Sequence, residues 1–125
     1  MHDLYRERYV SLGTYRRKGV PVDTPVWFAG HGAKLYVFSA ADAGKIKRLR
    51  NSPRARVAAC DVRGGRRGEW IAATARVVES PDTVASAYAA LRAKYGWQMR
   101  LTDGLSRLTG RIHRRAMIEI TLQES

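Results

Sequence analysis

The sequence has almost no cysteine and no long apolar segment. Its single cysteine, Cys60, excludes an intramolecular disulfide and any zinc site built from several cysteines. No apolar run approaches the roughly 18 residues that a membrane-spanning helix needs, and we expect no membrane partner. The first six residues contain no apolar core of a signal peptide. These absences predict a cytoplasmic protein.

Residues for metal binding and nucleophilic catalysis are scarce and scattered. The three histidines, His2, His31 and His113, lie far apart, and no two carboxylates have the spacing of an acid–base pair. Neither a Walker A nor a GxGxxG loop is present. We therefore predict no metal site, identify no catalytic residue, and interpret Cys60 as a buried structural thiol.

Acidic residues are also few, with 11 Asp plus Glu against 23 Lys plus Arg, for a net charge of +12. Such a field attracts an anionic partner: nucleic acid, an anionic membrane surface or a phosphorylated small molecule. Nine cations fall within residues 45–67, where Asp61 is the one acid. They alternate with strand-like apolar residues, and no helix-turn-helix, zinc finger or RNA-binding aromatic pair is present. The sequence therefore does not favour nucleic acid as the partner.

Hydrophobic periodicity predicts a small barrel of short antiparallel strands with helical inserts, of the α+β class. Alternating residues predict strands over 8–16, 20–29, 34–39, 54–61, 69–79 and 114–122, with a turn at 30–33. Pro21 and Pro25 interrupt the second of these strands, so part of it is an edge strand or an irregular stretch. Helical spacing predicts a basic helix over about 43–51, capped by Asp42, and one or two helices between Ser80 and Gly110. Without linkers or repeats, residues 1–125 form a single domain.

The segment from Ser39 to Arg50 carries the most informative chemical pattern. A strand ends in a hydroxyl and small residues, and a helix then begins with Lys45 and Arg48 one turn apart. Free N–H groups and the helix dipole favour an anion there. Lys45 supplies a point charge and Arg48 a planar fork of donors. This pattern predicts a phosphate site, and a solvated amphipathic helix is the alternative.

Several segments together resemble a known family. They are residues 24–28 (TPVWF), 36–39 (YVFS), 44–57 (GKIKRLRNSPRARV), 59–64 (ACDVRG) and 94–98 (KYGWQ). Over about residues 5–122 the chain resembles the pyridoxamine 5′-phosphate oxidase-like split barrels. More closely, it is similar to the actinobacterial branch of flavin- and deazaflavin-dependent oxidoreductases.

The resemblance implies a homodimer of split β-barrels with a cofactor in the groove between subunits. The implied cofactor is the deazaflavin coenzyme F420 or, alternatively, FMN. The positions that match the family's cofactor site are Thr24, Pro25, Val26 and Trp27 against the ring, and Ser39 and Lys45 at the phosphate. Ala40, Lys47 and Arg48 complete the set of candidate cofactor-binding residues. Trp27 as a plain core residue is the alternative, and Trp97 and Gln98 are candidates to reach the site from elsewhere in the dimer.

The implied reaction is hydride transfer between the reduced deazaflavin and a small organic acceptor such as an enone or quinone. The cofactor carries this chemistry, so no protein nucleophile is needed. The phosphodiester and glutamate tail of F420 match a charge of +12 better than the single phosphate of FMN does. The alternatives are an FMN-dependent oxidoreductase and a non-catalytic barrel that binds a cofactor or a tetrapyrrole. The chain shows no equivalent of the oxidases' C-terminal substrate- and flavin-contacting segment, which argues against oxidation of pyridoxamine phosphate.

Overall fold

The computed structural model describes residue 4 and residues 7–31, 34–110 and 115–123. His2 and His113 lie outside the described residues, as does the side chain of His31. The strands are β1 (Tyr9–Tyr15), β2 (Pro21–Val26), β3 (Ala29–His31), β4 (Lys34–Ala40), β5 (Arg54–Cys60), β6 (Ile71–Val78) and β7 (Arg115–Leu122). The helices are α1 (Gly44–Asn51), α2 (Pro81–Tyr95) and α3 (Trp97–Thr109).

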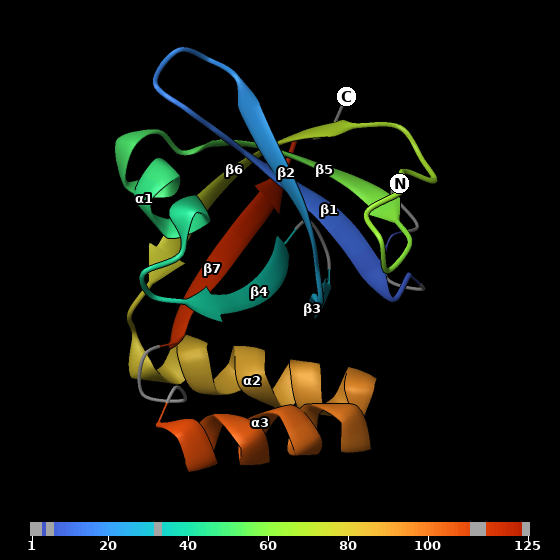
Figure 1. Ribbon diagram of the computed structural model, residues 1–125, viewed down its shortest axis with the longest axis vertical. Coiled ribbons are helices and arrows are strands. Elements are labelled where there is room, and N and C mark those ends of the chain that lie inside the picture. Colours follow the sequence, from blue (N-terminus) through green and yellow to red (C-terminus); the bar gives the residue numbers. More distant parts are fainter. Residues whose placement is uncertain (1–3, 5–6, 32–33, 111–114, 124–125) are drawn as a thin grey trace.

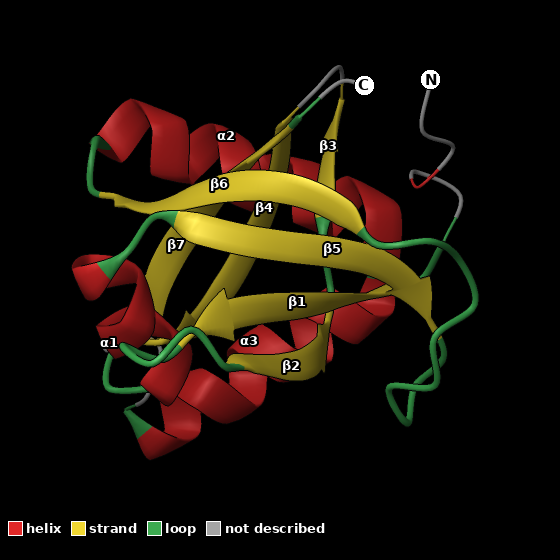
Figure 2. Ribbon diagram, turned by 90° about the horizontal axis from the view of Figure 1, so that it is seen from above, coloured by secondary structure: helices red, strands yellow, loops and turns green. Residues whose placement is uncertain are grey.

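All of these strands belong to one antiparallel sheet, in the order β2-β1-β5-β6-β7-β4-β3. The sheet curls into a half-barrel, with α1 at one end and the pair α2–α3 packed against β4 and β7 (Figures 1 and 2). The consecutive strands β2 and β3 form opposite edges of the sheet, so Trp27 and Phe28 carry the chain from one edge to the other. The α+β class and the barrel of short antiparallel strands are confirmed.

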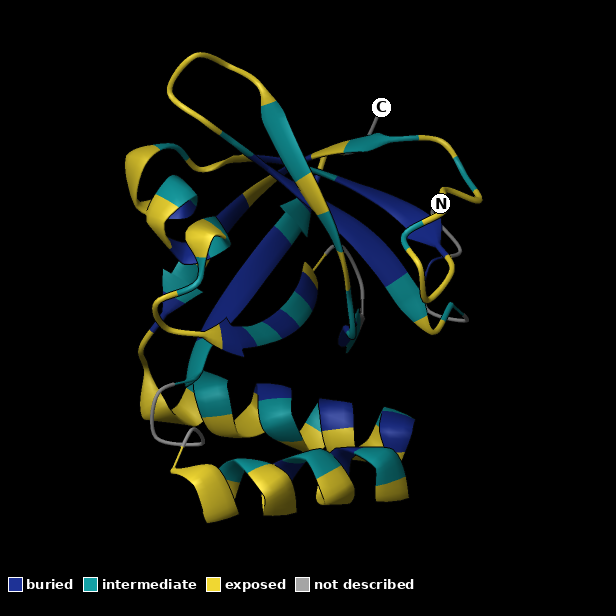
Figure 3. Ribbon diagram, in the orientation of Figure 1, coloured by how far each residue is buried: buried dark blue, intermediate teal, exposed yellow. Residues whose placement is uncertain are grey.

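Alternation along β4 separates two apolar cores. Leu35 and Val37 are fully buried within the curled sheet, together with the inward residues of β1, β5 and β7. Tyr36 and Phe38 point to the opposite face and pack against α2 and Met99 of α3. Figure 3 shows this arrangement as buried strands above a helix pair whose outer side is exposed. None of the described helices is both long and apolar enough to cross a membrane.

The hydroxyl of Tyr95 fastens the connection between the two sheet edges to the end of α2. Its oxygen accepts a hydrogen bond from the Phe28 N–H at 3.0 Å and lies 3.0 Å from the Phe28 carbonyl and 2.8 Å from the Arg8 carbonyl. The Trp27 ring stacks on the Tyr95 ring with centroids 4.7 Å apart. Burial raises the pKa of Tyr95 to about 12, so the phenol keeps its proton for one of the carbonyls.

Glu119 is a buried acid among the apolar residues of strand β7. Its carboxylate accepts hydrogen bonds from Tyr36 of β4 at 3.0 Å and from Arg76 of β6 at 3.1 Å, and Lys34 lies 3.5 Å away. Burial alone would raise the pKa of Glu119, but the Tyr36 and Arg76 hydrogen bonds bring it below its usual value. One carboxylate therefore links three neighbouring strands.

Three sequence-based predictions of local structure, those of a strand, a turn and a helix cap, are wrong. The return strand expected over 20–29 is split into β2 and β3, and Gly30 and His31, expected in a turn, belong to β3. The remaining two residues of that turn, 32–33, lie outside the described part. Asp42 does not cap α1, because the N-cap position is Ala43 and no side chain caps the helix.

Replacing Tyr95 with Phe should lower the free energy of unfolding by about 1–3 kcal/mol, because it leaves the buried Phe28 N–H without an acceptor. Chemical denaturation measures this. Tyr15→Phe is the matched control, since it keeps the ring on which Arg54 stacks. Equal stability of the two variants would show that the hydrogen bonds of the Tyr95 hydroxyl do not stabilise the fold.

Replacing Glu119 with Gln should cost about 1–2 kcal/mol near neutral pH, because the charge-assisted hydrogen bonds are weakened. The pKa of Glu119 is lowered in the folded state, so its contribution is complete above the unfolded pKa, near 4.5, and is lost as the pH falls through the folded value. The stability difference between wild type and Glu119→Gln should thus shrink in acid. Glu79→Gln, which removes one negative charge at an exposed site, is the matched control.

Candidate functional site

The predicted phosphate site lies where β4 ends and α1 begins. Lys45, in the first turn of α1, is partly buried, and this burial, with the nearby charge of Arg48, lowers its pKa. The first turn contains no acid, and no side chain caps it. The Ile46 N–H donates to the Ala43 carbonyl at 3.1 Å, whereas the N–H groups of Gly44 and Lys45 have no hydrogen-bond partner among the described residues. Among the described residues, no carboxylate pairs with Lys45 or Arg48. The start of α1 is therefore an uncompensated positive site.

Arg48 folds back over this first turn. Its Nε donates a hydrogen bond to Thr14 Oγ1 of β1 at 2.6 Å. A methyl group on residue 44 would come within 2.7 Å of Nη1, so Gly44 leaves the space that the guanidinium occupies. Burial, followed by repulsion from Arg16, lowers the pKa of Arg48. The outer nitrogens of Arg48 thus lie over the start of α1 next to a second cation.

The strand predicted to face a cofactor ring lies close to Arg48 along the sheet. Thr14, which holds Arg48, pairs with Val22 of β2, and Thr24 follows two residues later, roughly 7 Å along the strand. Side chains two apart share a face, so Thr24 lies on the same face as Val22. Its Oγ1 is buried and has no hydrogen-bond partner within the described ranges. An orphaned hydroxyl of this kind fits a polar group of a ligand.

The other predicted residues are placed less favourably. Ser39 is buried at the end of β4 and its hydroxyl donates to the Ala40 carbonyl at 3.2 Å, while Ala40 itself is exposed. Lys47 lies on the exposed side of α1. Pro25 is exposed, and Val26 is partly buried against the inner core. Trp27 is partly buried and stacked on Tyr95, a position that fits both a core residue and a residue that faces a cofactor ring.

A hollow of about 370 Å³ lies between the tip of the β1–β2 hairpin and the end of α1. It is lined by Tyr15, Arg16, Arg17, Gly19, Asn51, Ser52 and Arg54, with no acidic residue among them. The Arg54 guanidinium lies 4.0 Å from the centroid of the Tyr15 ring, which fixes its plane. Arg16 connects this hollow electrostatically to Arg48. The cations therefore continue from the start of α1 to the hairpin.

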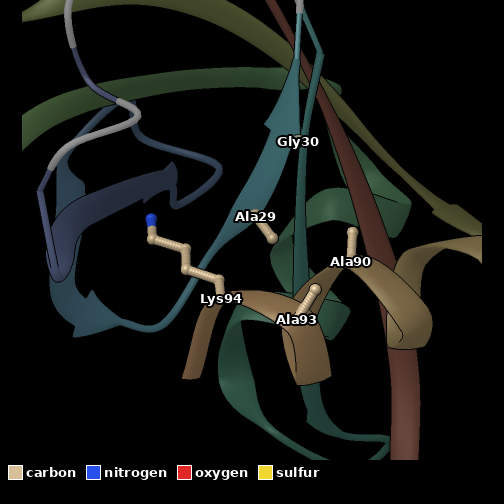
Figure 4. Close-up of a pocket in the computed structure, with 5 residues that line it drawn as sticks. All are labelled: Ala29, Gly30, Ala90, Ala93 and Lys94. Carbon is tan, nitrogen blue, oxygen red and sulfur yellow. The ribbon is translucent and has the colours of Figure 1, made fainter. Parts of the chain in front are cut away.

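A second hollow, of about 350 Å³, lies between β3 and α2 (Figure 4). It is lined by Ala29, Gly30, Ala90, Ala93 and Lys94. The Lys94 side chain extends away from Ala90 and Ala93 in Figure 4, and its ammonium lies 3.4 Å from the centroid of the Phe28 ring. Burial lowers the pKa of Lys94 to about 8, and the charge of Arg8 adds to this effect. This hollow offers an apolar surface beside the Trp27–Phe28 connection.

Sequence reasoning missed the residues that act through long-range contacts. In the sequence, Lys94 and Tyr95 stand out only as members of the segment 94–98. Glu119 and Asp103 were not singled out at all. The one local signal for Glu119 is an acid standing alone among Met117, Ile118 and Ile120. No group of three or more His, Cys, Asp or Glu able to hold a metal ion occurs in the described part of the chain.

Comparison with known proteins shows the family. A family model described as pyridoxamine 5′-phosphate oxidase matches residues 2–125. No protein with curated annotation gives a significant match. The family-level resemblance inferred from the sequence is thus confirmed over nearly the whole chain.

Solved structures with the same fold carry different functions. HutZ, the heme storage protein of Vibrio cholerae, superposes with a TM-score of 0.71 at 17% identity, covering 96% of this chain and 84% of that one. An FAD-binding protein of Mesorhizobium loti gives 0.65 at 18%, covering 97% and 83%. An F420 reductase gives 0.62 at 18%, covering 97% and 90%. At such identities these likenesses establish the fold alone, and with the matching family model they lead to one conclusion: the chain belongs to the pyridoxamine 5′-phosphate oxidase family.

Proposed function

We propose that this protein is an oxidoreductase that binds coenzyme F420 and transfers a hydride between the reduced cofactor and a small organic acceptor such as an enone or quinone. The observation that carries the proposal is the uncompensated positive site at the start of α1. There Lys45, the free N–H groups and the folded-back Arg48 converge without any acid in the first turn. Such a convergence fits a phosphate group.

The residues present fit the anionic part of the cofactor. Lys45 would neutralise the phosphate, and Arg48, anchored by Thr14 through Nε, would donate from its outer nitrogens. The orphaned Thr24 hydroxyl lies on the strand that resembles the family's ring-binding segment. Ser39 and Lys47 rank lower, because one is buried and bonded to Ala40 and the other is exposed on α1. When bound, the deazaflavin would supply the hydride chemistry.

The protein's own contribution would be binding and orientation. Trp27 is held in one orientation by its stacking on Tyr95, and Tyr95 is in turn fixed by Phe28 and Arg8. A rigid aromatic wall beside β2 would hold a planar ring in a defined pose and exclude water from one side of it. Ala29 and Gly30, which line the hollow between β3 and α2, follow Trp27 and Phe28 directly in the sequence. This hollow would offer small apolar residues to an acceptor. A homodimer, with the cofactor between subunits, belongs to the same proposal.

The continuation of the cations to the hairpin favours F420 over FMN. Burial is the main cause of the lowered pKa values of Lys45 and Arg48, and repulsion from Arg48 and from Arg16, respectively, adds to it, so the cations lie close enough to repel each other. A ligand with several negative charges relieves more of this repulsion than one phosphate does. The F420 reductase among the structural neighbours supports the choice only through a shared fold.

Replacing Lys45 with Ala should weaken F420 binding roughly tenfold or more, because a charge-assisted contact to the phosphate is lost. Fluorescence titration of the purified protein measures the dissociation constant, and circular dichroism checks the fold. Lys47→Ala, two residues away on the exposed side of α1, is the matched control and should bind normally. Equal affinities of the two variants for F420 would show that the phosphate does not bind at the start of α1. Tight binding without turnover of any acceptor would indicate a cofactor carrier.

Replacing both Arg17 and Arg54 with Gln should weaken F420 binding severalfold and flatten its salt dependence, while FMN binding stays unchanged. The reason is that these arginines lie around the hairpin hollow, where only a longer anion would reach. Parallel titrations with F420 and FMN at two salt concentrations make the comparison. If the wild-type protein binds FMN more tightly than F420, the fold and the family stand, and the enzyme is assigned to flavin chemistry.

A further inference from the structure

Helix α3 exposes a row of large apolar side chains. Trp97 is 72% exposed, Leu101 57%, Leu105 58% and Leu108 86%. Their spacing of four, four and three residues places them along one side of the helix, and the row extends roughly 16 Å. Met99 and Asp103, on the opposite side, are buried against the rest of the protein. Helix α3 is the outermost element next to α2, and its outer side is exposed along its length (Figures 1 and 3).

The charges around this row have one sign. Asp103, the acid of α3, points inward and accepts hydrogen bonds from Arg115 at 2.7 Å and Arg92 at 3.2 Å. Arg100 and Arg107 are exposed and form no ion pair with a described residue. The outward side of α3 thus combines four large apolar groups with two unpaired arginines and no acid.

A contiguous exposed apolar row of this kind marks a binding surface. Two copies of the chain meeting at this row would bring their arginines together without any acid to pair them, and each copy carries +12. An anionic surface would complement both the arginines and the total charge. A helix with Trp and Leu on one side and Arg beside them has the composition of a segment that lies in a membrane interface.

We propose that the outward side of α3 docks onto an anionic lipid surface. The helix lies parallel to the membrane plane, with Trp97, Leu101, Leu105 and Leu108 inserted at the headgroup level. Arg100 and Arg107 contact lipid phosphates. This attachment concerns a different surface from the α1 site and does not depend on the proposed cofactor. The sequence predicts no membrane partner, because it contains no long continuous apolar run. That criterion does not detect the row on α3, because polar residues separate its members in the sequence.

The test is flotation of the purified protein with vesicles of phosphatidylcholine alone and of phosphatidylcholine mixed with phosphatidylglycerol. Wild type should float with the anionic vesicles. The double variant Leu101→Gln, Leu105→Gln should bind them at least about tenfold more weakly, because two inserted side chains become polar. Val62→Gln is the matched control, since Val62 is 62% exposed but lies outside α3. Exposed substitutions should leave the fold intact, as circular dichroism can verify.

A second measurement separates insertion from charge attraction. Anionic vesicles should shift the tryptophan emission of wild type to the blue, and Trp97→Phe should abolish the shift. Equal binding by the double Gln variant and the Val62→Gln control would overturn the proposal, because the basic charge alone would then hold the protein. Absence of binding, together with a dimer that the double Gln variant dissociates in light scattering, would overturn it in favour of a contact between copies.

Discussion

The three contacts of one hydroxyl group, that of Tyr95, decide how the sheet of this protein can close. The two edge strands are joined by only two residues, and the backbone between them needs partners that no strand provides. The Tyr95 hydroxyl accepts a hydrogen bond from the Phe28 N–H and lies within hydrogen-bond distance of the Arg8 carbonyl, and the Tyr95 ring stacks on Trp27. The half-barrel, the helix pair and the strand that resembles a ring-binding segment are all positioned relative to this point.

Local patterns predicted most of the elements because their cause is local. Alternation along β4 and β7 follows from burial of one face, and the end of α1 at Asn51 follows from Pro53 nearby. The two prolines of the return strand indicate an interruption, but not its position, because Val26, Trp27 and Phe28 are as strand-like as their neighbours. What separates β2 from β3 is a bond from Tyr95, 67 residues away.

The candidate site divides in the same way. Lys45 and Arg48 were found because both lie on one short helix, whose spacing is visible in the chain. The bond that orients Arg48 comes from Thr14, 34 residues earlier, and the acid that joins three strands, Glu119, has its partners 43 and 83 residues away. Asp42 failed as a cap because a favourable residue type does not ensure that the backbone turns toward it.

The mutual repulsion of Lys45, Arg48 and Arg16 lowers the stability of the folded protein when no anion is bound. These like charges are held near each other by the fold, so the free state contains electrostatic strain that an anion would release. Any multivalent anion that binds there stabilises the folded state by an amount that grows with the ratio of its concentration to its dissociation constant. The melting temperature of the protein should thus behave as a sensor of polyanions, rising with inorganic phosphate and further with pyrophosphate at constant ionic strength.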